Sequence, residues 1–330
     1  MAPSDKCGNA ACTTSSSAPS PPDASSLRLC SRCRKIKYCS SECQTAAWPT
    51  HKRGCIRPNY IVKFHLSPDD IASPPVTRTL SCPSHAVFYM LHMALQTAFG
   101  WATTHSFDFA VVDPAYREDD DIMGFINRRM AAGPTGRGLP PASTPREYVL
   151  RVVDPVEQTM FSGIDRMHEG MRRHPNTTEK KADKFKLFEM FDDARFQGHK
   201  MVYTYDFGDN WEHYMTILGR ADATPDFICL DGSGHYVAED VGSTQGWEKL
   251  KAAYRTQSPT EEQKGRRKWF ERDASNADPR GLAGDRVNAW DRDAINRALE
   301  TETMLDRFQA MGDVAAENSA KMEAMLRKRN

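Results

Sequence analysis

Patterns of apolar and polar residues predict several strands and one clear helix after residue 57. Apolar and polar positions alternate in four short segments, as is typical of half-buried β-strands. These segments are 60–66, 107–111, 148–153 and 201–205. Between the first two, apolar residues recur every three or four positions from Ser84 to Phe99, which predicts an amphipathic helix. Ser84 stands where an N-cap belongs, and Gly100 where a C-cap glycine belongs.

Similar patterns predict a hairpin and two further helices. Apolar positions alternate through Tyr203 and Tyr205 and again through Trp211 to Met215, so residues 206–209 are expected to form a tight turn between two strands. We expect Gly208 to adopt a positive φ there, with the aspartate side chains accepting hydrogen bonds from backbone N–H groups. Helices are predicted over 178–195 and from 291 to 330.

The composition argues against several classes of protein. The chain has 330 residues, and its 44 Lys and Arg balance 44 Asp and Glu, unlike a strongly basic nucleic-acid binder or an acidic tail. No run approaches 18 apolar residues, so no membrane-spanning helix is expected. The residues after Met1 lack the apolar segment of a secretory signal. We therefore expect an intracellular protein, nuclear or cytoplasmic.

Charge and cysteine are concentrated unevenly along the chain. Residues 1–57 carry nine Lys and Arg against three acidic residues, a balance of +6, so the remainder carries 35 against 41. Seven of the nine cysteines also lie within the first 55 residues. Clustered cysteines in a reducing compartment indicate metal binding rather than disulfides. Residue 58 therefore marks an expected domain boundary.

Eight residues have the spacing of ligands for two zinc ions. They are Cys7, Cys12, Cys30, Cys33, Cys39, Cys43, His51 and Cys55. Short separations between cysteines let one turn present two thiolates at about 2.3 Å from a tetrahedral ion. Eight ligands complete two closed sites, which is typical of structural zinc. Zinc binding, on the order of 10 kcal/mol per site, would replace the core that about 50 residues cannot build.

Much of this segment resembles a MYND-type zinc finger. The resemblance rests on Cys30-Ser31-Arg32-Cys33, Tyr38-Cys39-Ser40-Ser41-Glu42-Cys43-Gln44, Trp48, His51-Lys52 and Cys55. It implies a small cross-brace finger with interleaved ligand sets. One set is Cys7, Cys12, Cys39 and Cys43, and the other is Cys30, Cys33, His51 and Cys55. The opening pair departs from the family, since four residues separate Cys7 and Cys12 where two are usual, and the spacer before Cys30 is longer than typical.

The same resemblance implies a protein partner, often a proline-containing peptide. The matching groove positions in this sequence are Ser31, Gln44 and Trp48. An indole face and an amide suit a preformed polyproline segment. The alternative is that Trp48 only packs the terminal helix onto the zinc core. The basic run 32–37 can contact nucleic acid or an acidic partner, although a solvated face is the simpler interpretation.

Residues 203–214 resemble the YxYDFGDxWxH signature of the plasmid pRiA4b ORF-3-like domain. Further blocks agree in order, and they are Leu91-His92, Gln96, Phe99-Gly100-Trp101, His105, Cys229, Gly232, Glu239-Asp240-Val241-Gly242, Gly246-Trp247 and Asp285-Arg286-Val287-Asn288. The resemblance covers 58–295, implies an α+β fold, and brings no established activity. Residues 113–180 depart from it as an expanded, loop-rich region, and Val241 and Ser243 stand where cysteine and glycine are common.

A catalytic site in this second domain is an open alternative. Asp206, Asp209, His213 and Glu239 can converge on a divalent cation, with Asp240, His92 and His105 as further candidates. The simpler interpretation is that Asp206 and Asp209 belong to a hairpin turn. Cys82 and Cys229 are expected to be ordinary thiols. The chain lacks a phosphate-binding loop, a nucleophile elbow, and the Asn-His-Ser run of SET methyltransferases.

The sequence therefore predicts a small zinc-stabilised cross-brace finger at 1–57, an α+β domain at 58–295, and a C-terminal helical tail at 296–330. The predicted function is that of an intracellular adaptor or regulatory protein with two structural zinc ions and no catalytic residues. Its finger would bind a protein partner, and its second domain has no identified ligand. The alternative function is a metal-dependent enzyme acting on nucleic acid.

Overall fold

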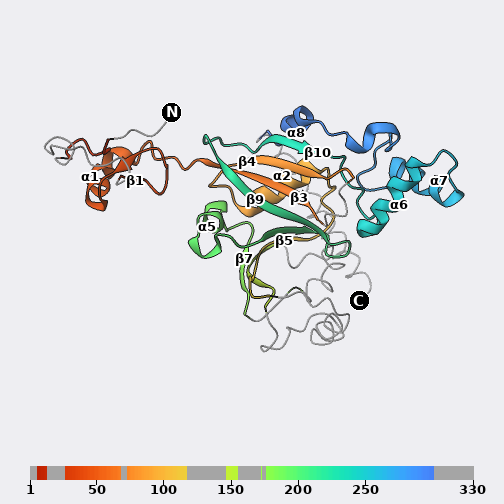
Figure 1. The fold of residues 1–330 in the computed structure, drawn as a ribbon, viewed down its shortest axis with the longest axis horizontal. Coiled ribbons are helices and arrows are strands. Elements are labelled where there is room, and N and C mark those ends of the chain that lie inside the picture. The colour runs from red at the N-terminus through yellow and green to blue at the C-terminus, as the bar shows by residue number, and fades with distance from the viewer. Residues whose placement is uncertain are drawn as a thin grey trace, which may run out of the picture.

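A computed structural model describes residues 6–12, 27–67, 73–116, 146–154, 172 and 176–300. The finger occupies one end of the molecule and the larger α+β domain the rest, as the red and the orange-to-blue parts of Figure 1 show. Of the predicted loop-rich region, residues 117–145, 155–171 and 173–175 lie outside the described residues, as do residues 301–330 of the predicted tail. No helix in the described ranges is both long and apolar enough to cross a membrane.

The finger contains one short hairpin and one helix. Strands β1 (Arg28–Leu29) and β2 (Lys37–Tyr38) pair antiparallel, and α1 (Ser41–His51) follows. Ser40 caps α1, since its side chain accepts a hydrogen bond from the Cys43 backbone N–H. The cluster of buried apolar side chains in this unit is small, and most of its members are cysteines. They are Cys30, Cys33, Tyr38, Ala47 and Cys55.

The second domain is built on one eight-stranded sheet. Its strands are β3 (Asn59–Leu66), β4 (Thr77–Cys82), β5 (Phe107–Val112), β6 (Tyr148–Val153), β7 (Thr178–Lys181), β8 (Met201–Tyr205), β9 (Trp211–Ala221) and β10 (Ile228–Ser233). They lie in the order β10-β4-β3-β9-β8-β5-β6-β7, and every pair is antiparallel except β6 with β7. The alternating segments of the sequence thus form the central strands.

Helices pack on the sheet and at its end. They are α2 (Phe88–Phe99), α5 (Leu187–Phe191), η4 (Ala194–Phe196), α6 (Ser243–Arg255), α7 (Glu261–Arg272), η5 (Gly284–Asn288) and α8 (Arg292–Leu299). In Figure 1, α2 crosses one face of the sheet, while α6 and α7 lie together at the end away from the finger. This arrangement of separate strands and helices confirms the α+β prediction.

The main core lies between α2 and the sheet. Phe88, Leu91, Leu95 and Phe99 of α2 are at most 1% exposed. The ring of Phe88 packs edge-on against Phe109 of β5, with ring centroids 4.9 Å apart. Each such side chain contributes about 1.5–3 kcal/mol through burial. The recurrence at three and four positions therefore stabilises the domain as expected for an amphipathic helix.

The predicted start of α2 was wrong, while its end is confirmed. The helix begins at Phe88, and its N-cap residue Val87 makes no side-chain capping bond. The Ser84 hydroxyl instead donates a hydrogen bond to the Arg57 carbonyl, so it holds the end of the finger against the domain. Gly100 ends the helix in the left-handed conformation at φ 67°.

The predicted helix over 178–195 was also wrong. Thr178–Lys181 forms edge strand β7, which pairs parallel with β6 in the register Leu150↔Thr178. Only the five residues of α5 and the 3₁₀ turn η4 are helical in the rest of this segment. Pairing with an available strand outweighed the weak helical propensity of the sequence.

Gly246 is required by a close backbone approach in α6. A Cβ at this position would lie 1.8 Å from the Val241 carbonyl oxygen. We predict that Gly246→Ala destabilises the protein by about 2–3 kcal/mol, because the backbone must shift. The matched control is Gly265→Ala in α7, where a Cβ has open space and should stabilise the helix by up to about 1 kcal/mol. Urea unfolding followed by tryptophan fluorescence measures both, and equal stability of the two variants would contradict this account.

Candidate functional site

Four thiols of the first ligand set meet beside the start of α1. Cys7 and Cys12 come from the N-terminal segment, Cys39 precedes α1, and Cys43 lies in its first turn. The Sγ atom of Cys39 lies 3.5 Å from that of Cys12 and 3.4 Å from that of Cys43. Zn–S bonds of about 2.3 Å in a tetrahedron separate neighbouring sulfurs by about 3.8 Å. The four donors therefore fit one zinc ion.

The four residues of the second ligand set are all buried. Cys30 and Cys33 flank the turn after β1, His51 ends α1, and Cys55 follows it. The Sγ atoms of Cys30 and Cys55 are 3.7 Å apart, and Cys33 Sγ is 3.6 Å from His51 Nε2. These four donors also lie within 4.8 Å of one another, so the set fits a second zinc ion.

The two sets interleave along the chain, which confirms the predicted cross-brace and its two structural zinc ions. Side-chain amides support the thiolates from outside. Asn9 Nδ2 lies 3.5 Å from Cys43 Sγ, and Gln44 Nε2 lies 3.7 Å from Cys30 Sγ. Such outer contacts orient ligands and stabilise their charge. Each set supplies four protein donors, so the zinc ions of the finger are closed to water and substrate.

The three predicted peptide-binding residues are partly or fully accessible. Gln44 and Trp48 lie one turn apart on α1 and share a face. The Gln44 amide contacts Cys30, which precedes the exposed Ser31. Trp48 is 37% exposed, although its ring also packs edge-on against His51 at a centroid distance of 5.8 Å. The indole therefore contacts the zinc core on one side and solvent on the other.

Ion pairs tie the finger to the second domain. Arg57 and Arg220 of β9 both pair with Asp192, which lies at the end of α5. Lys35, in the basic run of the finger, pairs with Asp222 at 3.2 Å. This second pair is largely exposed, so its contribution is about 0–1 kcal/mol. One part of the predicted basic face thus lies against the domain.

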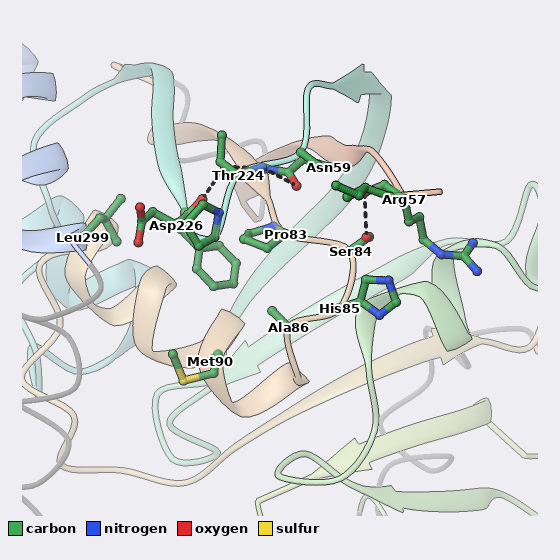
Figure 2. Close-up of a pocket in the computed structure, with 14 residues that line it drawn as sticks. Arg57, Asn59, Pro83, Ser84, His85, Ala86, Met90, Thr224, Asp226 and Leu299 are labelled. Carbon is green, nitrogen blue, oxygen red and sulfur yellow. Dashed lines mark hydrogen bonds between the residues drawn. The ribbon is translucent and has the colours of Figure 1, made fainter. Parts of the chain in front are cut away.

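Figure 2 shows a pocket where the finger joins the domain. It has a volume of about 300 Å³, and its apolar lining includes Ile56, Pro83, Ala86, Met90, Phe227 and Leu299. Its polar side chains bond to neighbouring groups. Asn59 donates to Thr224 at 2.8 Å, and Ser84 donates to the Arg57 carbonyl at 3.3 Å. The pocket therefore offers mainly apolar contact.

In the second domain, the turn after β8 is formed differently from the prediction. Asp206 and Asn210 adopt positive φ values of 57°, whereas Gly208 does not. Asp206 Oδ1 accepts hydrogen bonds from the backbone N–H groups of Gly208 and Asp209, as expected for an aspartate in a turn. The turn thus fixes Asp206, which is 3% exposed.

Glu239 is buried close to this turn. Its carboxylate accepts hydrogen bonds from the Ala102 N–H, the Thr104 hydroxyl and the Tyr205 hydroxyl, each at 2.5 Å. His105 Nε2 lies 4.0 Å from the same carboxylate. The Nε2 atom of His105 therefore lies within 4.0 Å of both the Glu239 and the Asp206 carboxylates.

The side chains of the remaining two candidates, His213 and Asp209, contact other groups. His213 is fully buried, its Nδ1 lies 3.4 Å from the Tyr203 carbonyl, and its ring packs on Phe99. Burial lowers the pKa of His213 to about 3. Asp209 Oδ2 accepts a hydrogen bond from the Gly242 N–H. Neither side chain is among the metal-type donors that meet near Asp206 in the described residues.

Two residues with weaker support in the sequence complete the cluster. His105 and Asp240 join Asp206, with one donor atom from each residue and all three atoms within 4.8 Å of one another. His92, the other histidine considered, is stacked on Phe107 and bonded to the Tyr203 hydroxyl. Cys82 and Cys229 are buried free thiols, as expected. His105 was recognisable only as part of a family-like block, because it lies 101 residues before Asp206.

The fold and ligand geometry define a zinc-finger protein with an attached α+β domain. Two family models match the chain. The model for a plasmid pRiA4b ORF-3-like protein matches residues 60–297, and the MYND finger model matches residues 5–55. The first match spans most of the chain. This chain therefore belongs to the plasmid pRiA4b ORF-3-like family and carries a MYND finger.

Individual relatives match one part or the other. Histone-lysine N-methyltransferase SMYD3 of Homo sapiens is 62% identical over 29 residues, which are 9% of this chain and 7% of that protein. Uncharacterized protein y4hQ of Sinorhizobium fredii (strain NBRC 101917 / NGR234) is 23% identical over 192 residues, 58% of this chain and 71% of that protein. The crystal structure of MM3350, a protein of unknown function from Methanosarcina mazei Go1, matches with 20% identity and a TM-score of 0.43, covering 71% of this chain and 96% of that chain.

Loss of one zinc ligand should unfold the finger. We predict that Cys39→Ser lowers zinc content from two ions per chain to one or none, because Cys39 contacts two other ligands of its set. Elemental mass spectrometry measures zinc, and limited proteolysis measures folding of residues 1–57. Cys82→Ala is the control, since Cys82 lies in the core of the other domain and should leave two zinc ions bound. Two zinc ions in the Cys39 variant would refute the ligand assignment.

Buried histidines should make the second domain sensitive to acid. The pKa of His213 is about 3 in the folded protein, below the ordinary 6.5. The unfolded chain therefore takes up a proton at this histidine below pH 6.5 while the folded protein does not, so the free energy of unfolding falls as the pH is lowered from 6.5 toward 3. Each such histidine removes about 1.4 kcal/mol per pH unit in this window. Between pH 7 and pH 5, we predict that the free energy of unfolding of His213→Phe decreases by about 2 kcal/mol less than that of the wild type. Urea unfolding at both values measures this, and parallel losses in variant and wild type would disprove it.

Proposed function

We propose that this chain is a zinc-dependent adaptor whose MYND finger binds a proline-containing segment of a partner protein. A MYND finger supports zinc binding and a role in protein interaction. The proposal adds that the bound segment of the partner contains proline. This is supported chiefly by Trp48, whose indole is exposed to solvent and packs on its other side against His51.

The residues around Trp48 suit an extended peptide. Gln44 lies one turn earlier on the same face of α1, and Ser31 is exposed beside the Cys30 that Gln44 contacts. A proline ring can pack on the indole, while the amide and hydroxyl can bond to the carbonyl groups of the peptide. A polyproline segment is already extended, so little conformational entropy is lost on binding.

The charge of the finger favours a partner with acidic residues beside its prolines. Residues 1–57 have a balance of +6 from Lys, Arg, Asp and Glu, which becomes +3 with seven thiolates and two Zn²⁺ counted, and Arg32 and Arg34 are exposed. Complementary charge accelerates association and selects among partners. The proposal places the protein inside the cell, in nucleus or cytoplasm, where thiols stay reduced and bind zinc. A metal-dependent activity on nucleic acid stays a prediction.

Binding of proline-rich peptides by the full zinc-loaded chain tests this proposal. The probes are a panel of fluorescent proline-rich peptides with flanking acidic residues, each paired with a version in which alanine replaces proline. We predict that Trp48→Ala weakens binding of the best peptide by at least about tenfold, since a buried aromatic anchor contributes about 1.4 kcal/mol or more. Fluorescence anisotropy gives the dissociation constants.

The matched control is Leu29→Ala, which removes another exposed apolar side chain from the same finger. It should leave both zinc content and peptide affinity unchanged. Equal affinity for proline and alanine peptides, or unchanged binding by the Trp48 variant, would reject the proposed groove.

A further inference from the structure

A third group of metal-type donors lies in the α+β domain, far from the finger in sequence. His105 follows α2, Asp206 directly follows β8, and Asp240 precedes α6. His105 Nε2 is 3.0 Å from Asp240 Oδ1 and 3.7 Å from Asp206 Oδ2. Donors bound to one ion at about 2.0–2.2 Å lie roughly 3–4 Å apart. The three atoms are therefore spaced as ligands of a common ion.

The position of Asp206 is determined by its own turn. Its Oδ1 atom accepts two backbone hydrogen bonds, from Gly208 at 2.9 Å and from Asp209 at 3.2 Å. Its other oxygen, Oδ2, faces His105. The carboxylate is thus oriented by the backbone and directs one oxygen toward the imidazole, as required of a preorganised ligand.

Glu239 adds buried negative charge behind these donors. Its side chain is 0% exposed, and its hydrogen bonds come from a backbone N–H and two hydroxyl groups, all uncharged. The basic side chain that the described residues place near Glu239 is His105, whose Nε2 lies 4.0 Å from the carboxylate and is charged only when the ring is protonated. A buried carboxylate is costly unless a positive charge compensates it. A divalent ion held by the neighbouring donors would place positive charge close to this buried carboxylate.

From this geometry we propose that His105, Asp206 and Asp240 bind one divalent transition-metal ion. An imidazole with two carboxylates suits Mn²⁺ or Zn²⁺ better than Mg²⁺ or Ca²⁺, which prefer oxygen ligands alone. Glu239 stabilises the ion by its charge and fixes the two segments that carry His105 and Asp240. This site is independent of the finger and of its partner.

The proposed centre differs in kind from the zinc sites of the finger. It has three protein donors instead of four, and the Asp240 side chain is 49% exposed, so the ion is reached from solvent. Three ligands leave coordination positions for water or for an oxygen of a bound molecule. The ligand class that fits such open positions is an anionic oxygen group, such as a carboxylate or a phosphate.

Metal titration of the full chain with both finger sites filled by zinc tests the proposal. Mn²⁺ is the probe, because it is followed by electron paramagnetic resonance without interference from zinc. We expect one Mn²⁺ per chain, displaced by one further equivalent of Zn²⁺ according to the usual order of affinities. Asp206→Asn and Asp240→Asn should each weaken Mn²⁺ binding at least about tenfold, since each removes a charged ligand.

The two variants keep the local structure in different ways. Asparagine at 206 retains an oxygen for the turn hydrogen bonds, and asparagine at 240 tolerates the φ of 61° found there. Asp209→Asn is the matched control, because Asp209 is in the same turn but bonds to Gly242 N–H outside the cluster. Circular dichroism confirms that each variant is folded.

Absence of Mn²⁺ binding at millimolar concentration, together with no Zn²⁺ beyond the two ions of the finger, would overturn the proposal. The same holds if Asp209→Asn weakens binding as much as Asp206→Asn and Asp240→Asn do. In that case the cluster is an ion-pair network in which protonated His105 balances the carboxylates.

Discussion

The buried carboxylate of Glu239 joins parts of the domain that the sheet alone does not connect. It accepts hydrogen bonds from Ala102 and Thr104 after α2 and from Tyr205 at the end of β8. Its own backbone N–H donates to the side-chain oxygen of Asn276, whose Nδ2 donates to the carbonyls of Gly100 and Val237. A buried carboxylate is stable only while its donors remain in place, so one side chain holds the loop after α2, the hairpin turn and the segment before α6 in a fixed relation.

The two parts of the chain are stabilised by different forces. The domain buries a large set of aromatic and aliphatic side chains between α2 and the sheet. The finger has only a few buried side chains, and most of them are metal ligands. Folding of the finger is therefore linked to zinc concentration and thiol chemistry, while that of the domain is linked to packing and to its buried histidines. One part can be lost under oxidising or chelating conditions while the other survives.

The sequence predicted what depends on local spacing. The zinc ligands and the strands β3, β5, β6 and β8 followed from short-range patterns, because ligand pairs and period-two alternation are local properties. The start of α2 was misplaced because a serine before a helix can bond elsewhere, as Ser84 does. The helix expected over 178–195 failed because the pairing of β7 with β6 is decided by the sheet. His105, Asp206 and Asp240 form a cluster in which the first and last residues are more than 130 positions apart in sequence. Periodic patterns report only on nearby residues and therefore cannot predict such a contact.

The ion pairs of Asp192 have a consequence for how a captured partner is presented. Arg57 stands only two residues after the last zinc ligand, Cys55, and is anchored to the same carboxylate as Arg220 of the sheet. The connection between finger and domain is therefore short and is held in place by ion pairs. If the finger binds a peptide as proposed, these ion pairs would fix the orientation of that peptide relative to the domain. The domain would then also select among partner proteins by shape, because a partner with a bulky part on the side that faces the domain would clash with it.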